Sequence, residues 1–160
     1  MAVLARDVME TQVVTIDANA SLLDAYRLFV EEDISGAPVV DEDGRVMGVL
    51  SVRDLLRATE EERDTALVQT TYFRDLAEFS GPDWGTTTED FQDRMSERTV
   101  ADVMTPGAIV VSPDATIPEV ASTLRRRHVH RVLVAEDERL LGLISTFDLV
   151  ALLEKESPPR

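Results

Sequence analysis

Two stretches of this chain carry residues whose types and spacing could do chemistry. Ser51 and Asp54 follow a glycine and two aliphatic residues. Ser145 and Asp148 stand in the same arrangement ninety-four positions later. A serine three residues before an acid is typical of a helix N-terminus, because each side chain can cap an amide group of the other residue. Each stretch therefore predicts a buried strand that runs directly into a helix.

Such a strand-to-helix corner has two interpretations. The unpaired amide groups and the positive end of the helix dipole make it a natural binding site for anions and polar ligands. The same residue types would also be present if they served only to cap the helix. The repetition of the whole pattern within one chain favours a functional role over capping alone.

The composition is that of a globular protein and argues against membrane spans and nucleic-acid binding. The chain has 160 residues, of which 44% are hydrophobic and 29% charged, and no apolar run approaches the roughly 20 residues that span a bilayer. A net charge of −15 would repel a phosphate backbone. The absence of cysteine excludes disulfides and thiol nucleophiles. The N-terminus does not resemble a signal peptide, so we expect a cytoplasmic protein.

The two corners close a longer internal repeat. Each copy predicts a strand, a helix with a Ser or Thr N-cap, two further strands and a final helix, which together indicate an α/β fold. The matched segments are residues 7–9 and 102–104, 14–16 and 109–111, 21–24 and 116–119, 37–40 and 132–135, 41–44 and 136–139, and 46–50 and 140–144. Helical spacing predicts buried faces made of Leu22, Ala25, Tyr26, Phe29 and Val30 in one copy and Ile117, Val120, Ala121 and Leu124 in the other.

In their order, these segments resemble a tandem cystathionine-β-synthase (CBS) domain pair, or Bateman module. The resemblance is carried by Asp-Val-Met, a Val-x-Thr strand, the stretch 34–41 and the repeated Ser-x-x-Asp corner, and it covers residues 5–58 and 101–153. It implies two β-α-β-β-α repeats packed as a pseudo-two-fold pair. It also implies a cleft ligand such as AMP, ADP, ATP or S-adenosylmethionine, no required cofactor, a regulated partner protein and a homodimer.

In the first repeat, the resemblance supplies a complete set of adenosine contacts. The expected ligand-binding residues are Thr15, Gly36, Ala37, Pro38, Ser51, Arg53 and Asp54. Asp54 would take the ribose, since an ionised carboxylate can accept two O–H donors at once. Arg53 has two interpretations, a phosphate contact or a solvated arginine in the first helical turn.

The second repeat departs from this set. Ser145 and Asp148 remain, and Thr146 between them is also an expected ligand-binding residue. However, Arg131-Val132-Leu133 replaces Gly-Ala-Pro, Val110 replaces Thr15 and Phe147 replaces Arg53. The ribose and base contacts are therefore in doubt there. His130 and Arg131 are expected beside the central cleft, where they could clamp phosphates.

The basic run that contains these residues has simpler interpretations too. Arg125–Arg127 would place favourable charge at a helix C-terminus. A metal site at His128 and His130 is conceivable, but two histidines without cysteine make a poor ligand set, and we expect no metal.

The segment 59–100 separates the repeats and is acidic and rich in aromatic residues. A stripe of Val68, Tyr72, Leu76 and Phe79 predicts one helix, and a second helix is expected to end near Met95. This helical insert would pack on the chain itself, as a cap or dimer contact, or would dock a partner or cover a ligand cleft. The tail 154–160 is expected to be disordered.

No serine or acid is patterned with the histidines as a nucleophile and its base, so we expect no enzyme activity. The sequence predicts a regulatory adenosine-nucleotide sensor that modulates an unknown partner protein. The alternative is a ligand-independent scaffold for interaction or oligomerisation, in which the Ser-x-x-Asp corners only cap helices.

Overall fold

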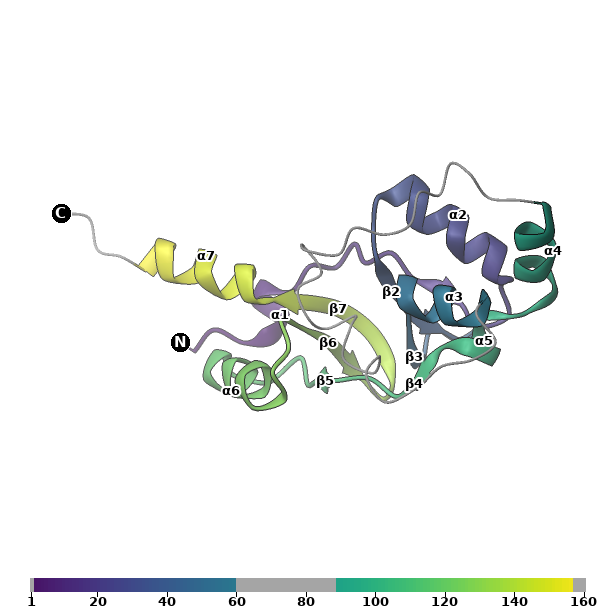
Figure 1. Cartoon of the computed structure of the whole chain (residues 1–160). Helices are drawn as coiled ribbons and strands as arrows, with labels where there is room; N and C mark the ends of the chain where they lie inside the picture. Colours follow the sequence, from purple (N-terminus) through teal and green to yellow (C-terminus); the bar gives the residue numbers. More distant parts are fainter. Residues whose placement is uncertain (1, 60–88, 157–160) are drawn as a thin grey trace. The chain divides into compact units, whose positions relative to one another are not determined.

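The computed structural model describes residues 2–59 and 89–156, and the chain divides into two compact units (Figure 1). The central unit comprises Val14–Ala108, and the terminal unit combines Met1–Val13 with Ile109–Arg160. Each repeat thus contributes most of one unit. The Asp-Val-Met segment at the start of each repeat, however, belongs to the unit built around the other repeat.

In the central unit, a sheet is packed against helices. The elements are β1 (Ile16–Asp17), α2 (Leu22–Glu32), β2 (Gly36–Val40), β3 (Val46–Ser51), α3 (Val52–Thr59), α4 (Glu89–Glu97), α5 (Val100–Val103) and β4 (Thr105–Pro106). The strand order is β1-β2-β3-β4, with β1 parallel to β2 and the other neighbours antiparallel. Strand β4 therefore brings residue Thr105 beside the end of β3.

Local sequence fixes the ends of these elements. Helix α2 begins after Ser21, whose hydroxyl accepts a hydrogen bond from the Asp24 amide at 3.1 Å. The hairpin between β2 and β3 is closed by the Asp41 carboxylate, which accepts from two amides of the turn, and by Gly44, whose φ of 79° suits glycine. The predicted cap and the predicted turn are both confirmed.

The core of the central unit lies between the sheet and α2, α3 and α4. Its fully buried side chains include Leu22, Val39, Leu50, Leu55 and Met95. Because Met95 belongs to α4, this helix is part of the core. The predicted second helix of the insert is thus present and ends at Glu97.

The terminal unit repeats the same arrangement. Its elements are α1 (Ala5–Val8), β5 (Val110–Val111), α6 (Ile117–Arg127), β6 (Arg131–Glu136), β7 (Arg139–Ser145) and α7 (Thr146–Glu156). The sheet order is β5-β6-β7, again parallel and then antiparallel. Helix α6 begins after Thr116, which caps the Glu119 amide as predicted. The α/β fold and the two repeats are confirmed.

Some details differ from the sequence prediction, and others lie outside the described residues. Ala121 was predicted to be on the buried face of α6 but is exposed. Val30 was predicted to be buried but is 50% exposed, because successive helical residues lie about 100° apart and Val30 turns away from the face that Phe29 occupies.

The tail was predicted to be disordered from residue 154, but α7 continues to Glu156, because no proline interrupts the helix before Pro158. The predicted stripe from Val68 to Phe79 and residues 157–160 lie outside the described residues.

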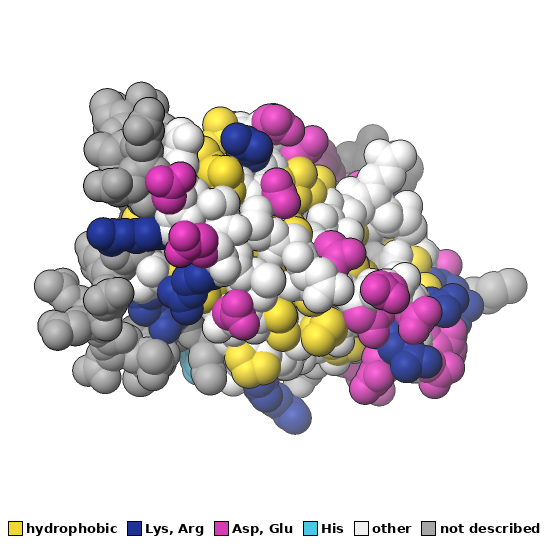
Figure 2. All heavy atoms as spheres, turned by 90° about the vertical axis from the view of Figure 1, so that its right-hand side faces the viewer, with side chains coloured by type: hydrophobic (Ala, Val, Ile, Leu, Met, Phe, Trp, Pro, Cys, Tyr) yellow, Lys and Arg dark blue, Asp and Glu magenta, His cyan; other side chains and the backbone are white. Residues whose placement is uncertain are grey.

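The described surface agrees with the composition. Acidic side chains are scattered over the face in Figure 2, with basic side chains between them. Within residues 2–59 and 89–156, no helix is both long enough and apolar enough to cross a bilayer.

Candidate ligand-binding site

The first Ser-x-x-Asp corner lies where β3 ends and α3 begins, and we call Gly36, Ser51 and Asp54 the central corner. Gly36 of β2 is the antiparallel partner of Ser51. The Val52 amide donates to the Ser35 carbonyl at 2.9 Å, which ties the start of α3 to the start of β2. The sequence therefore folds so that Gly36 lies beside Ser51, where β3 ends and α3 begins.

Ser51 holds one oxygen of the Asp54 carboxylate. Asp54 Oδ2 accepts from the Ser51 amide at 2.8 Å and from the Ser51 hydroxyl at 3.1 Å. The Asp54 amide in turn donates to Ser51 Oγ at 3.3 Å. These bonds are the capping box that the sequence predicts.

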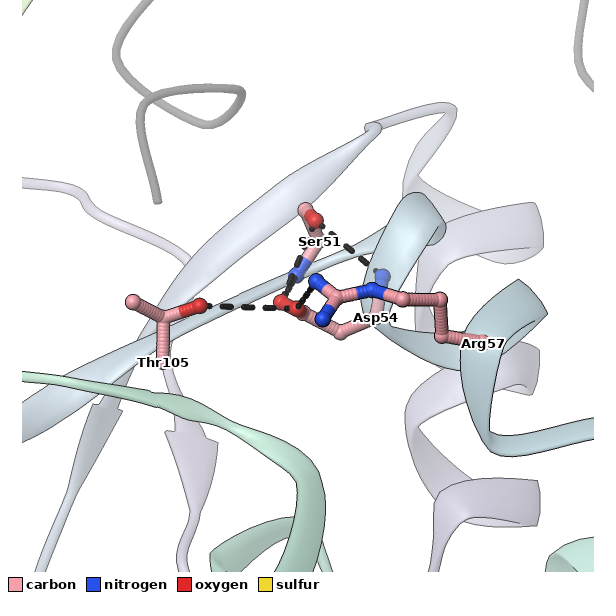
Figure 3. A network of polar contacts seen from close by, with 4 residues as sticks. All are labelled: Ser51, Asp54, Arg57 and Thr105. Atoms are coloured by element: carbon pink, nitrogen blue, oxygen red, sulfur yellow. Dashed lines mark hydrogen bonds and ion pairs between the residues drawn. The ribbon is translucent and has the colours of Figure 1, made fainter. Parts of the chain in front are cut away.

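The other carboxylate oxygen has two longer contacts (Figure 3). Asp54 Oδ1 accepts from Arg57 Nη2 at 3.4 Å and from Thr105 Oγ1 at 3.4 Å. Both distances lie beyond the usual range of strong charged hydrogen bonds, which is about 2.7–2.9 Å. Oδ1 is therefore the atom to which a new donor could bind more closely.

Asp54 is unusual among the capping acids because it is buried, with 3% of its surface exposed. Burial raises the pKa of Asp54 above its ordinary value, although hydrogen bonds from Ser51, the nearby Arg57 and the Thr105 hydroxyl oppose this effect. The exposed capping acids Asp102 and Glu119 behave in the opposite way, because hydrogen bonds from their N-cap residues lower their pKa. Capping alone therefore does not explain the environment of Asp54.

The other residues predicted for this site lie in the same unit. Ala37 and Pro38 are buried in β2, directly after Gly36. Thr15 is exposed and precedes β1, the parallel neighbour of β2. Arg53 is exposed in the first turn of α3. The central unit thus contains all seven residues predicted from the first repeat.

The terminal corner consists of Arg131, Ser145 and Asp148, and it has the same internal bonds. Asp148 Oδ2 accepts from the Ser145 amide at 2.8 Å and from the Ser145 hydroxyl at 3.1 Å, and the Asp148 amide donates to Ser145 Oγ at 3.3 Å. Arg131 is the strand partner of Ser145, in the position that Gly36 has in the central corner. Asp148 is only half-buried.

The remaining predicted residues of the second repeat lie near this corner. The Thr146 amide donates to the His130 carbonyl at 2.9 Å, and Val132 is buried in β6. Arg125–Arg127 form the exposed last turn of α6, as the helix C-terminus interpretation requires. Among the described residues, no third acidic or histidine ligand gathers with His128 and His130.

Two contacts of Asp54 were missed in the sequence. Arg57 lies three residues further along α3, and Thr105 lies fifty-one residues away on β4. The repeat contains one signal that could have drawn attention to Thr105. Thr105 directly follows the second Asp-Val-Met segment, in the position that Glu10 has after the first. Thr105 lies beside Asp54 only because the segment that begins the second repeat belongs to the unit built around the first repeat. A reader of the sequence would have to know this exchange in order to predict the contact.

Comparison with known proteins identifies the repeated unit. The family model described as CBS domain matches residues 5–61 and 100–155. An uncharacterized protein of Methanocaldococcus jannaschii is 30% identical over 154 residues, which cover 94% of this chain and 90% of the relative. The SNF1-related protein kinase regulatory subunit gamma-1-like of Arabidopsis thaliana is 25% identical over 150 residues, and the match spans 30% of its length.

Solved structures show the same fold. The crystal structure of CBSX2 in complex with AMP has a TM-score of 0.66 and 23% identity, with 96% of this chain and 98% of the other covered. The CBS domain pair of protein MJ0100, in complex with 5-methylthioadenosine and S-adenosyl-L-methionine, has a TM-score of 0.62 and 19% identity, with 98% and 100% covered. Likeness at this level of identity establishes the fold.

Proposed function

The chain belongs to the CBS domain family, and on this premise we propose that it is a regulatory module that binds an adenosine-containing ligand at the central corner. CBSX2 was crystallised with AMP, and the CBS pair of MJ0100 with two ligands that both contain adenosine. The ribose is common to all of these ligands. Support for a ribose site in this chain must come from its own residues.

The observation that carries the proposal is the buried carboxylate of Asp54. An ionised acid in this position costs stability, since burial raises the pKa of Asp54 and thus disfavours its charged form. Its Oδ1 atom has only two contacts of 3.4 Å among the described residues. A ribose hydroxyl would give this oxygen a short hydrogen bond, and the binding energy would offset the cost of the buried charge.

The neighbours of Asp54 fit the rest of an adenosine ligand. We propose that the Gly36–Pro38 backbone meets the base, because Gly36 has no side chain to prevent close approach. Thr15 and Ser51 would bind polar groups of the sugar and phosphate. Arg53, exposed at the start of α3, would add positive charge for a phosphate.

The terminal corner would be a second and weaker site. It keeps the serine and the acid as Ser145 and Asp148 and adds the hydroxyl of Thr146, but Arg131 and the buried Val132 replace Gly36 and Ala37 of the first repeat. We propose that His130 and Arg131 contribute to phosphate binding there. A side chain in place of Gly36 leaves less room for a base, so the central corner would fill first.

We propose that ligand binding regulates a partner protein in the cytoplasm. A ligand that binds one arrangement of the module more tightly than another shifts the population toward it, and a partner then meets a different surface. The relative that is named a kinase regulatory subunit supports this role. A homodimer and ATP as one of the physiological ligands belong to the same proposal.

A ligand-independent scaffold is the second candidate function. It is favoured by the terminal corner, where the same three Ser145–Asp148 bonds cap α7 around a half-buried acid. In a scaffold, Asp54 and Asp148 would only cap their helices. Adenosine compounds would then not bind at either corner.

Isothermal titration calorimetry with AMP, ATP and S-adenosylmethionine tests the two functions. We expect the wild type to bind at least one compound, and Asp54→Asn to weaken that binding at least about tenfold, because the charge-assisted bond to the ribose is lost. Asp24→Asn is the matched control, since Asp24 caps α2 in the same unit but is exposed. If no compound gives a heat of binding, or if Asp54→Asn binds as tightly as the wild type, the result would support the scaffold instead.

A further inference from the structure

If Asp54 binds the ribose, as proposed above, part of the central corner must move before the ligand can reach it. The residue is 3% exposed. Its Oδ2 atom is held by Ser51, and its Oδ1 atom is in contact with Thr105 and Arg57. A hydroxyl group of a ligand therefore gains Oδ1 only if Thr105 or Arg57 makes room.

Thr105 is held in place by the sheet. It pairs with Val49, which anchors β4 to the antiparallel strand β3. Gly48 also lies so close to the Thr105 carbonyl oxygen that a Cβ atom at position 48 would collide with it. Moving the backbone of Thr105 would thus require β4 to separate from β3, so only its short side chain can turn away from Asp54.

The long side chain of Arg57 can move further from Asp54 than the short side chain of Thr105, whose backbone is fixed in the sheet. Its side chain is 24% exposed and has several rotatable bonds, and its ion pair with Asp54 Oδ1 is long, at 3.4 Å. Its Nε atom is buried and has no hydrogen-bond acceptor within residues 2–59 and 89–156. The guanidinium group therefore gains a hydrogen bond if it rotates toward an acceptor. Figure 3 shows it lying over the carboxylate that it would uncover.

We infer that Arg57 is the movable cover of Asp54 and a specificity-determining residue of the site. A ligand must give Asp54 hydroxyl donors that replace the arginine, and it must give the displaced guanidinium group an anionic acceptor. A nucleoside 5′-phosphate offers both groups. A nucleoside offers only the hydroxyls, so it opens the site at the cost of the Arg57–Asp54 ion pair.

Calorimetry with AMP and adenosine on the wild type and Arg57→Met tests this role. The variant removes the cover and the phosphate contact together. We expect adenosine to bind Arg57→Met about fivefold more tightly than the wild type, which corresponds to roughly 1 kcal/mol for a partly exposed ion pair, while AMP gains nothing. The preference for AMP over adenosine should therefore fall at least about fivefold. Arg27→Met is the control, since it removes the same charge from an exposed position of α2 and should leave the preference unchanged.

The outcomes separate this inference from the proposed function. If Arg57→Met binds AMP and keeps the wild-type preference for AMP over adenosine, the proposed role of Arg57 as a cover is wrong. The proposed adenosine site is not affected by that result. If both ligands bind more weakly to a folded Arg57→Met, the arginine positions Asp54 and the cover is again contradicted. Failure of the wild type to bind either ligand overturns both proposals. Arg57→Gln, which keeps a polar side chain, should show the same loss of preference if Arg57→Met does not fold.

Discussion

The central and terminal corners have the same Ser–Asp bonds in different surroundings. The three distances that join Ser51 to Asp54 are 2.8, 3.1 and 3.3 Å, and those that join Ser145 to Asp148 are identical. Each helix start is thus capped equally well. Capping accounts for everything that the two corners share, and it cannot account for what differs.

The differences lie around the acids. Asp54 is buried and touches Thr105 and Arg57, whereas Asp148 is half-buried. Thr105 pairs with Val49 on β3, and the residue that pairs at the equivalent place on β7 is Glu10, an acid. The equivalent of Arg57 is Ala151, ninety-four positions later.

Burial gives the ionised form of Asp54 a cost that an exposed capping acid such as Glu119 avoids. The exposed cap Glu119 has a lowered pKa, so its ionised form is favoured in the folded chain. Asp54 has a raised pKa because of burial, so its ionised form is disfavoured. A buried charge that the fold does not need is the usual mark of a functional residue.

The largest effect is expected when the central corner is given the side chain of the terminal corner. Gly36→Arg places an arginine beside Ser51, as Arg131 stands beside Ser145. The arginine would fill the space next to Asp54 and pair with its carboxylate, so AMP affinity should fall at least about 100-fold. Calorimetry measures the affinity, and circular dichroism checks that the variant is folded. A folded variant with wild-type affinity would show that the glycine is irrelevant to binding.

Replacement of the buried Asp54 by asparagine should not lower the melting temperature of the chain, unlike most substitutions of a capping residue. In the folded chain, burial raises the pKa of Asp54 above its ordinary value of 3.8, so the folded state binds this proton more tightly than the unfolded state. The proton on Asp54 stabilises the folded chain fully at pH values below the pKa of Asp54 in the unfolded chain. This stabilisation is lost as the pH rises through the pKa of Asp54 in the folded chain. Asp54→Asn should therefore melt at the same temperature as the wild type, or up to about 4 °C higher, at pH 7.

The gap in melting temperature between Asp54→Asn and the wild type should narrow as the pH falls from 7 toward 4. Glu119→Gln is the control with the opposite sign, because the pKa of Glu119 is lowered and its ionised form stabilises the fold above the unfolded pKa. It should melt slightly lower than the wild type at pH 7. A clearly lower melting temperature for Asp54→Asn would mean that the central acid serves the fold.

A smaller effect is expected at Thr105. Thr105→Val keeps the shape of the side chain and removes the hydroxyl that contacts Asp54 Oδ1 at 3.4 Å. Because this contact is long, we expect AMP affinity to change by no more than about threefold. A much larger loss, measured by calorimetry, would mean that Thr105 binds the ligand itself.

The smallest effect is expected in the terminal corner. Asp148→Asn should leave the affinity of the central corner for AMP within about twofold of the wild type, since AMP is expected to fill the central corner before the terminal corner. Calorimetry under the same conditions gives the comparison with Asp54→Asn. Equal losses for the two variants would remove the distinction between the corners.

Much of the fold could be predicted from the sequence because its signals are local. The caps at Ser21 and Thr116, the hairpin turn at Asp41 and the corners at Ser51 and Ser145 each depend on residues within a few positions of one another. Burial is harder to predict, because it depends on what covers a helix face. Val30 was therefore placed in the core although it is exposed.

The candidate site was predictable in its residue types and not in its environment. The repeat gave Asp54 and Asp148 the same Ser-x-x-Asp pattern, with a less complete set of ligand contacts around Asp148, and nothing local to either corner indicates that only Asp54 is buried. That difference arises because β4, from the start of the second repeat, pairs with β3 of the first. Such a long-range pairing places Thr105 on Asp54, and no pattern within a single repeat contains it.

A crystal structure of the chain grown with AMP would show whether Asp54 binds the ribose. We expect a ribose hydroxyl within hydrogen-bond distance of Asp54 Oδ1, with the adenine against the Gly36–Pro38 backbone. We also expect the three Ser51–Asp54 bonds to remain as they are now. An empty central corner in crystals saturated with AMP, with Asp54 still bound only to Ser51, Arg57 and Thr105, would contradict the proposal that Asp54 binds the ribose.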